Sequence, residues 1–289
     1  MRVLVTGATG HVGRIVVERL VAAGVRVRAM TRRPHEARFP DSVDVVAGDL
    51  TDPAALAPVL ADVDRLYLFP VPGTAREVVA LARQAGVGRI VVLSSAAVTS
   101  GADTTFHLPV EQAVEALSPE WTHVRPGEFM LNKLFLWGPS IRTEAVVYEP
   151  YPDAAWWPVH ERDVADVAVA ALLQDGHEGK AYNLSGPDLI TRRDQVAAIA
   201  TATGRDVRLE VVTPEQAREH YRRQGGFAAA NADFLLGFTD YAGNQREPTS
   251  VSYPTAHPAG PRPTAQDVTG QPARTFAQWA HDHADELRP

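Results

Sequence analysis

The sequence predicts an α/β fold, in which a doubly wound parallel sheet is joined to a smaller C-terminal α/β lobe. Three observations support this class. The chain opens with an apolar strand, a glycine-rich turn and an amphipathic helix. Strand-and-helix units then repeat with short connections, which is the pattern of a parallel sheet with right-handed crossovers. This rhythm breaks over residues 127–157 and returns in a shorter form from Lys180.

The opening unit carries the most specific motif of the chain. A strand from residue 2 leads into Gly7, Gly10 and Gly13, and a helix begins near His11. In such a unit the first glycine permits the tight turn, the second lets a pyrophosphate approach the backbone, and the third allows the helix to pack on the strand. The motif therefore favours a dinucleotide site, the alternative being a turn whose glycines serve packing only.

The second strand, residues 25–30, bears on the choice of cofactor. Sites for NAD usually place an acid after this strand to bind the adenosine ribose. Here Arg32 and Arg33 stand instead, and their guanidinium groups suit a phosphate, so the sequence favours NADP(H) over NAD(H). The alternative is a pair of solvated arginines on a loop.

The following strands extend the candidate cofactor site along their carboxyl ends, where ligands bind in open α/β sheets. A third strand, 43–46, leads to Asp49, which would either bond the adenine amino group or only stabilise its own turn. We expect strands at 65–69 and 89–96, helices at 74–85 and 107–117, and a sixth strand at 121–127. Further candidate cofactor residues at these strand ends are Leu50, Phe69, Pro70, Val71, Ser94 and Pro126.

Composition narrows the class of partner. The 289-residue chain has a net charge of -7, which argues against nucleic acid or an anionic membrane as the main partner and leaves a small-molecule substrate. It has no cysteine, so thiol catalysis and disulfides are excluded. No apolar run reaches the ~18 residues of a membrane span. The chain starts directly with a core strand, so we expect a cytoplasmic protein, with a homodimer as one possible assembly.

The interval that breaks the rhythm is rich in aromatic residues. They would form either a pocket wall or a small second core, and the position of the interval after a central strand favours the wall. We assign residues 1–130 to the nucleotide-binding core, with 158–175 packing back on it, and residues 131–157 and 176–289 to a substrate-binding lobe. A loop at 237–264 would help to enclose the substrate. The candidate pocket residues are Phe129, Met130, Trp137, Trp156 and Trp157.

Five segments together resemble the NmrA-like branch of the atypical short-chain dehydrogenase/reductases: GATGHVG, VVLSSA, HVRPGEFMLN, HERDVADVAVAAL and VTGQPARTFAQWAHDHA. The resemblance implies an extended Rossmann fold with an NADP(H) site, and either reduction of quinones, carbonyls or imines or a non-catalytic role as a nucleotide redox sensor. By the same resemblance Pro70 and Val71 flank the nicotinamide ribose, Arg32 contacts the adenosine end, and the pyrophosphate is bordered by Thr9, Gly10, His11 and Val12.

The catalytic pair usual in this superfamily, a Tyr four residues before a Lys, is absent from the sequence. In its place the sequence offers Ser95, His107 and Glu111. We expect His107 to supply a proton, Glu111 one helical turn away to favour its protonated form, and Ser95 to bond the developing oxyanion. The alternative is an exposed helical pair and a serine that caps its own loop. The histidines lack the spacing of a metal site, so no metal is expected.

Overall fold

The computed structural model describes residues 1–246 and 264–289, and they form two compact units. Unit 1 comprises residues 1–126, 161–184 and 265–271. Unit 2 comprises residues 127–160, 185–264 and 272–289. Part of the predicted loop 237–264, residues 247–263, lies outside the described residues.

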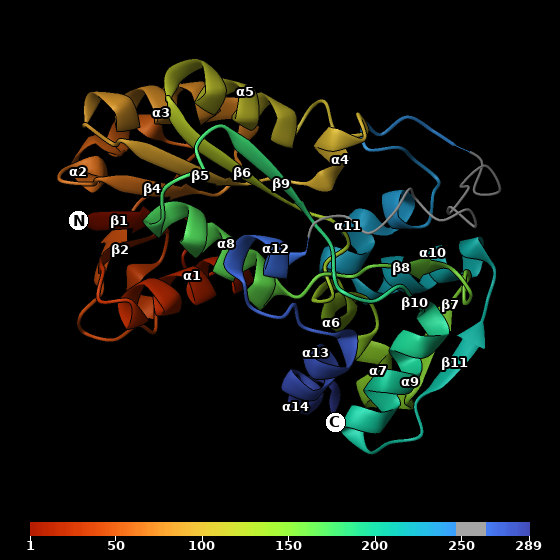
Figure 1. Cartoon of the computed structure of the whole chain (residues 1–289). Coiled ribbons are helices and arrows are strands. Elements are labelled where there is room, and N and C mark those ends of the chain that lie inside the picture. The colour runs from red at the N-terminus through yellow and green to blue at the C-terminus, as the bar shows by residue number, and fades with distance from the viewer. Residues whose placement is uncertain (247–263) are drawn as a thin grey trace. The chain divides into compact units, whose positions relative to one another are not determined.

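Unit 1 is built on a parallel sheet of seven strands in the order β3-β2-β1-β4-β5-β6-β9 (Figure 1). The strand order reverses between β1 and β4, which is the mark of a doubly wound sheet and confirms the predicted fold class. The strands are β1 (Arg2–Val5), β2 (Arg26–Thr31), β3 (Asp44–Ala47), β4 (Arg65–Leu68), β5 (Arg89–Leu93), β6 (Glu120–Pro126) and β9 (Lys180–Leu184).

Helices cover both faces of this sheet (Figure 1). On one face α3 and α5 pack side by side over an apolar layer that includes Leu66 and Ile90, and on the other α1 packs on α8. The helices of unit 1 are α1 (His11–Ala22), α2 (Ala57–Leu60), α3 (Ala75–Gln84), α4 (Ala96–Thr99), α5 (His107–Leu117), α8 (Glu161–Leu173) and α12 (Ala265–Thr269), with 3-10 turns η1 (Pro34–Glu36), η2 (Pro53–Ala55) and η3 (Pro72–Thr74).

Two segments assigned to the smaller lobe belong instead to unit 1. Strand β9 pairs in parallel with β6 over Thr122–Pro126, so it extends the sheet. Helix α12 packs against α8 in the same unit. The sequence prediction failed here because both segments follow the break in the βα rhythm, while their pairing partners lie far away in the chain.

Unit 2 holds two small sheets, in which β7 pairs in parallel with β11 and β8 pairs antiparallel with β10. Its strands are β7 (Val146–Glu149), β8 (Ala155–Trp156), β10 (Ile190–Thr191) and β11 (Arg208–Val211). Its helices are α6 (Asn132–Leu136), α7 (Gly138–Glu144), α9 (Arg192–Thr203), α10 (Pro214–Gln224), α11 (Gly226–Leu235), α13 (Phe276–Asp282) and α14 (Ala284–Leu287). Helices α9, α10 and α13 each begin with a capping box, in which the first-turn residue and the N-cap threonine bond each other.

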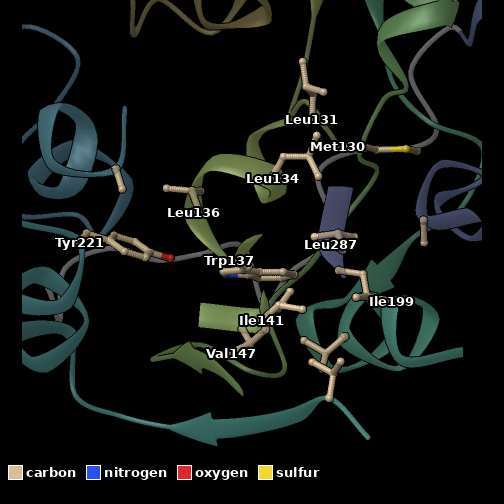
Figure 2. Close-up of a cluster of buried hydrophobic side chains, with 14 of the residues drawn as sticks. Met130, Leu131, Leu134, Leu136, Trp137, Ile141, Val147, Ile199, Tyr221 and Leu287 are labelled. Atoms are coloured by element: carbon tan, nitrogen blue, oxygen red, sulfur yellow. The ribbon is translucent and has the colours of Figure 1, made fainter. Parts of the chain in front are cut away.

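Trp137 lies in the middle of the hydrophobic core of unit 2 (Figure 2). Both Trp137 and Met130 are 1% exposed and pack with residues such as Ile141, Ile199 and Leu287. This corrects the expectation that Met130 and Trp137 line a pocket wall, because side chains closed off on all sides form the second core that was the alternative.

No helix in residues 1–246 and 264–289 is long and apolar enough to cross a membrane.

Candidate active site

The glycine turn between β1 and α1 has the geometry that the motif predicts. Gly7 has a φ of +60°, a backbone conformation in the left-handed region that favours glycine. A Cβ on Gly13 would lie 2.2 Å from the carbonyl oxygen of Gly7, so only glycine lets the helix start this close to the turn. Helix α1 begins at His11 with Gly10 as its N-cap, with no capping side chain and no acid in its first turn. An anion can therefore approach the helix start without repulsion from an acid there.

The surroundings of this turn contain both exposed and buried residues. Thr9, Gly10 and His11 are exposed, whereas Val12 is buried under the helix. The ring of Phe69, 43% exposed, lies against Gly7 at the end of β4. Pro70 and Val71 continue from Phe69, while Leu50 and Pro126 are buried at the carboxyl ends of other strands.

Arg32 and Arg33 differ in their partners. Arg33 forms an ion pair of 2.9 Å with Glu36 in the turn η1. Arg32 is exposed directly after β2 and makes no hydrogen bond or ion pair within residues 1–246 and 264–289.

Asp49 accepts hydrogen bonds from the amide and hydroxyl of Thr51 through Oδ1, at 2.9 and 2.8 Å, and these bonds lower the pKa of its carboxyl. Asp49 thus stabilises its own turn, as one of the two interpretations expected.

Glu111 has partners other than the predicted one. Its side chain is fully buried, and it accepts hydrogen bonds from Nε and Nη2 of Arg125, at 2.8 and 2.5 Å, and from the Ser94 hydroxyl at 2.5 Å. Burial raises the pKa of Glu111, but the hydrogen bonds and positive charge of its partners prevail and hold this pKa below its usual range. The expected pair of His107 and Glu111 is therefore wrong, because Glu111 belongs to a network that ties α5 to β6 and to the end of β5.

The partner of His107 is Asp103. Nδ1 of His107 lies 2.5 Å from Oδ2 of Asp103, which is fully buried. The His107 side chain is 15% exposed and its ring meets the exposed ring of Phe106 edge-on, with centroids 4.8 Å apart. The residue spacing is four in both cases, but Asp103 precedes the helix and Glu111 lies within it, so helical periodicity alone pointed to the wrong acid.

Ser95 caps the short helix α4, where its Oγ accepts a hydrogen bond of 3.2 Å from the amide of Ala97. The serine thus has the loop role that was the alternative interpretation. A hydroxyl that accepts from an amide still has its own proton to donate. Ser94 and Ser95 both follow β5 at the carboxyl edge of the sheet, but only Ser95 is partly exposed.

One group of side chains has the composition of a metal site. Glu111, Glu115 and His123 place candidate ligand atoms within 4.8 Å of one another. Both oxygens of Glu111 are already bonded to Arg125, and a guanidinium at that distance repels a cation. The group is accounted for by its ion pairs, including the 3.1 Å contact of His123 with Glu115.

In unit 2 an ionic cluster of buried Lys133 with half-buried Glu128 and Arg192 lies next to the predicted pocket residues. Oε1 of Glu128 contacts Nζ of Lys133 at 2.8 Å and also bonds Arg192. Burial raises the pKa of Glu128, but the two cations prevail and lower it to about 2. Lys133 also lies over the ring of Trp137, 4.3 Å from its centroid, while Phe129, Trp156 and Trp157 are half-buried. The sequence pattern did not reveal this cluster, since Arg192 lies 64 residues after Glu128 in the chain.

A doubly wound sheet with a glycine turn at the β1–α1 crossover defines a Rossmann-type nucleotide-binding protein. Residues 7–175 match the NAD(P)H-binding family, and the chain belongs to this family. Over 295 residues, 99% of both chains, it is 40% identical to the (4-alkanoyl-5-oxo-2,5-dihydrofuran-3-yl)methyl phosphate reductase of Streptomyces griseus. Over 294 residues, 98% of both chains, it is 32% identical to the NAD(P)H azoreductase of Xenophilus azovorans.

Two solved structures have the same fold over nearly the whole chain. Triphenylmethane reductase of Citrobacter sp., complexed with NADP(H), superposes with a TM-score of 0.78 at 22% identity, covering 98% of this chain and 100% of that one. The NADPH-dependent quinone oxidoreductase of Escherichia coli, complexed with NADPH, gives 0.75 at 23% identity, covering 98% and 99%. These two structures confirm the fold that the resemblance implies, and the family match confirms NAD(P)H binding. The protein is an NAD(P)H-dependent oxidoreductase.

Proposed function

We propose that this protein is an NADPH-dependent reductase of a fairly large apolar or aromatic carbonyl, quinone or imine, working without the Tyr/Lys pair. Two relatives that match almost the whole chain carry the name of reductases. The choice of NADPH rests on Arg32, whose guanidinium makes no hydrogen bond or ion pair in the described residues. Arg32 lies at the strand end where an NAD site would place an acid.

The residues fit the cofactor because a Cβ on Gly13 would lie 2.2 Å from the Gly7 carbonyl oxygen and one on Gly10 would lie 3.2 Å from it, so these glycines let α1 start close to the turn, where its amides can meet a pyrophosphate. In this proposal Arg32, with Arg33 beside it, contacts the adenosine 2'-phosphate, and Phe69, Pro70 and Val71 contact the nicotinamide ribose. Bound there, NADPH would supply a hydride for an electrophilic carbon of the substrate, with NADP⁺ as the oxidised product. The pyrophosphate is bordered by Gly7, Thr9, Gly10, His11, Val12 and Gly13, and the remaining contacts of the site come from Leu50, Ser94 and Pro126.

Ser95, which follows β5, and His107, the first residue of α5, then act on the oxygen of a carbonyl or quinone, or on the nitrogen of an imine. The Ser95 hydroxyl donates a hydrogen bond to the oxygen as negative charge develops on it. His107 gives that oxygen a proton, and the neutral imidazole afterwards regains a proton from water. The hydride adds one hydrogen and two electrons to carbon and His107 adds a proton to the other atom, which together balance the reduction of one double bond. Both residues follow a central strand at its carboxyl end, the edge where open α/β sheets bind their ligands.

The substrate class rests on aromatic side chains and on the relatives. Phe129, Trp156 and Trp157 are half-buried and so keep surface that can contact a ring system. The names of the relatives specify an alkanoyl dihydrofuranone phosphate and azo compounds, both with an unsaturated group that can accept a hydride. We infer an acceptor of this electrophilic kind, with a carbonyl, quinone or imine as the reacting group.

The test is to incubate the purified protein with NADPH or NADH and a panel of quinones, aromatic ketones, azo dyes and an acylated dihydrofuranone, and to follow the nicotinamide absorbance. We expect turnover of at least one member, with NADPH preferred. His107→Ala and Ser95→Ala should each retain cofactor affinity and lose turnover. Tight binding of NADPH with no turnover across the panel would support the sensor function instead, and full activity of both variants would remove these two residues from the mechanism.

A further inference from the structure

Asp103 has no role in the mechanism above, yet it is the closest acid to His107. We propose that Asp103 is a positioning residue, which holds Nδ1 of His107 so that Nε2 is the ring nitrogen that gives its proton to the substrate. This inference rests on the proposed function, because it assigns a residue to the same proton transfer.

The carboxylate of Asp103 is itself held in place. It is fully buried, and Oδ1 accepts hydrogen bonds from the amides of Thr105 and Phe106 at 3.2 and 2.9 Å. Oδ2 accepts one from the amide of His107 at 3.0 Å and faces Nδ1 of its ring at 2.5 Å. A carboxylate bonded on both oxygens by fixed amides cannot rotate, so it presents Oδ2 to the imidazole in one direction.

The protonation state of Asp103 decides which nitrogen of His107 carries a proton. Burial raises the pKa of the Asp103 carboxyl, but the hydrogen bonds from Phe106 and His107 prevail and hold this pKa below its usual range. An ionised carboxylate only accepts hydrogen bonds, so Nδ1 must carry the proton in the contact. Nε2 is then the nitrogen that faces away from the carboxylate, and Asp103 stays ionised, as a buried acid beside a catalytic histidine does elsewhere.

A second contact limits the orientation of the imidazole. Phe106 precedes His107, and their rings meet edge-on at an interplanar angle of 74°. The ring is therefore restrained by a hydrogen bond at Nδ1 and by an aromatic contact. Such restraint is typical of groups that must meet a reacting atom within a narrow range of positions.

Asp103 also caps helix α5. The N-cap of α5, Phe106, has no capping side chain, and Asp103 satisfies amides at the start of the helix instead. Oδ2 accepts from both the His107 amide and Nδ1 of its ring, so replacing the acid by its amide affects one capping bond together with the ring contact. A test of the positioning role must therefore observe the imidazole itself and include a variant that loses a capping acid where no histidine takes part.

The central variant is Asp103→Asn, compared with Asp194→Asn as a capping control. Asp194 bonds the amide and hydroxyl of Thr191 in the capping box of α9, where no histidine takes part. We expect kcat of Asp103→Asn to fall about 100-fold or more with little change in KM, since general acid catalysis contributes about 10²–10⁴-fold. Asp194→Asn should lose stability and keep its kcat.

Nitrogen NMR of the histidine-labelled full chain reads the imidazole directly and needs no substrate. In the wild type the His107 signals should show a proton on Nδ1, and in Asp103→Asn this preference should be lost. A wild-type His107 with its proton on Nε2 alone would overturn the proposal even if the variant fails to fold. A fall in kcat without a change in the His107 signals would also overturn it, because the effect would then be structural.

A double-variant cycle completes the test. On a His107→Gln background, Asp103→Asn should cost no further activity, because a positioning residue acts only through the group it positions. A further full loss in the double variant would overturn the proposal. If the wild type reduces no member of the panel, the proposed function fails and the catalytic role of Asp103 with it. If the wild type is active and Asp103→Asn equally so, this proposal alone fails.

Discussion

Gly13 packs so closely on Gly7 that position 13 has no room for a side chain. A Cβ at position 13 would lie 2.2 Å from the Gly7 carbonyl oxygen and 2.9 Å from its carbonyl carbon, distances at which backbone atoms must move apart. The start of α1 is thereby fixed against the end of β1, and any anion bound at this turn depends on that position.

Gly13→Ala should consequently displace α1 and weaken NADPH binding by about tenfold or more, with a loss of stability of about 1–3 kcal/mol from overpacking. Calorimetric titration and urea unfolding measure the two effects. Gly88→Ala is the matched control, because its Cβ would meet only the Asp64 carbonyl oxygen at an ordinary 3.7 Å. Equal affinities in Gly13→Ala and Gly88→Ala would contradict the assignment of this turn to the cofactor.

Arg32→Ala should weaken NADPH by about 10- to 100-fold, the range expected for a lost hydrogen bond to a charged group. Binding of NADH should change little, since it lacks the 2'-phosphate. The ratio of the two dissociation constants is the readout. Arg26→Ala provides a control at the opposite end of β2, where the side chain is also exposed. A parallel loss for both cofactors would place Arg32 outside the 2'-phosphate site.

Arg33→Ala should have a smaller effect on the same ratio. Its guanidinium already pairs with Glu36 at 2.9 Å, and both side chains are more than half exposed, at 70% and 51%. Exposed pairs of this kind contribute little, so Arg33 is only partly withdrawn from a phosphate. A ratio that changes more in Arg33→Ala than in Arg32→Ala would reverse the assignment of the two arginines.

Local sequence patterns predicted where helices α1 and α5 begin. The period of apolar residues and the glycine after the strand are properties of a short segment, which is why α1 and α5 begin at His11 and His107 as expected. Pairing between distant segments has no such local signal. Strand β9 was therefore assigned to the wrong unit, and the ionic cluster of Glu128 with Arg192 was not foreseen.

Residue type alone also could not decide what each candidate side chain contacts. Trp137 and Trp156 occur in one aromatic interval, but the first is enclosed in a core and the second stays half-buried on β8. The sequence pattern selected Glu111 by its spacing from His107. In the structure the carboxylate of Glu111 is instead bonded by Arg125, which lies on strand β6. Burial and partner choice depend on tertiary packing, which short-range periodicity does not contain.

Arg125→Met should destabilise the protein by about 3–5 kcal/mol, because it leaves the carboxylate of Glu111 buried without its cation. Replacing both residues, in Glu111→Gln with Arg125→Met, should recover most of this loss. Arg19→Met is the control, since its 2.9 Å ion pair with Asp166 is partly exposed and should contribute about 0–1 kcal/mol. Urea unfolding at neutral pH measures all four proteins, and a double variant no more stable than the single one would refute the coupling.

Because of Glu128, the free energy of unfolding should fall as the pH is lowered. Its two cationic neighbours lower its pKa from 4.5 to about 2 in the folded chain. Because the folded value is the lower one, the ionised carboxylate stabilises the fold above about pH 4.5, and this contribution disappears as the pH falls toward about 2. A pKa shift of this size corresponds to about 3 kcal/mol.

Glu128→Gln should lose that part of the pH dependence and be less stable at neutral pH, whereas Glu210→Gln, on the exposed strand β11, should follow the wild type. Unfolding curves from pH 6 to the acid limit provide the measurement, and coincident wild-type and Glu128→Gln profiles would show that the two cations do not hold this carboxylate ionised.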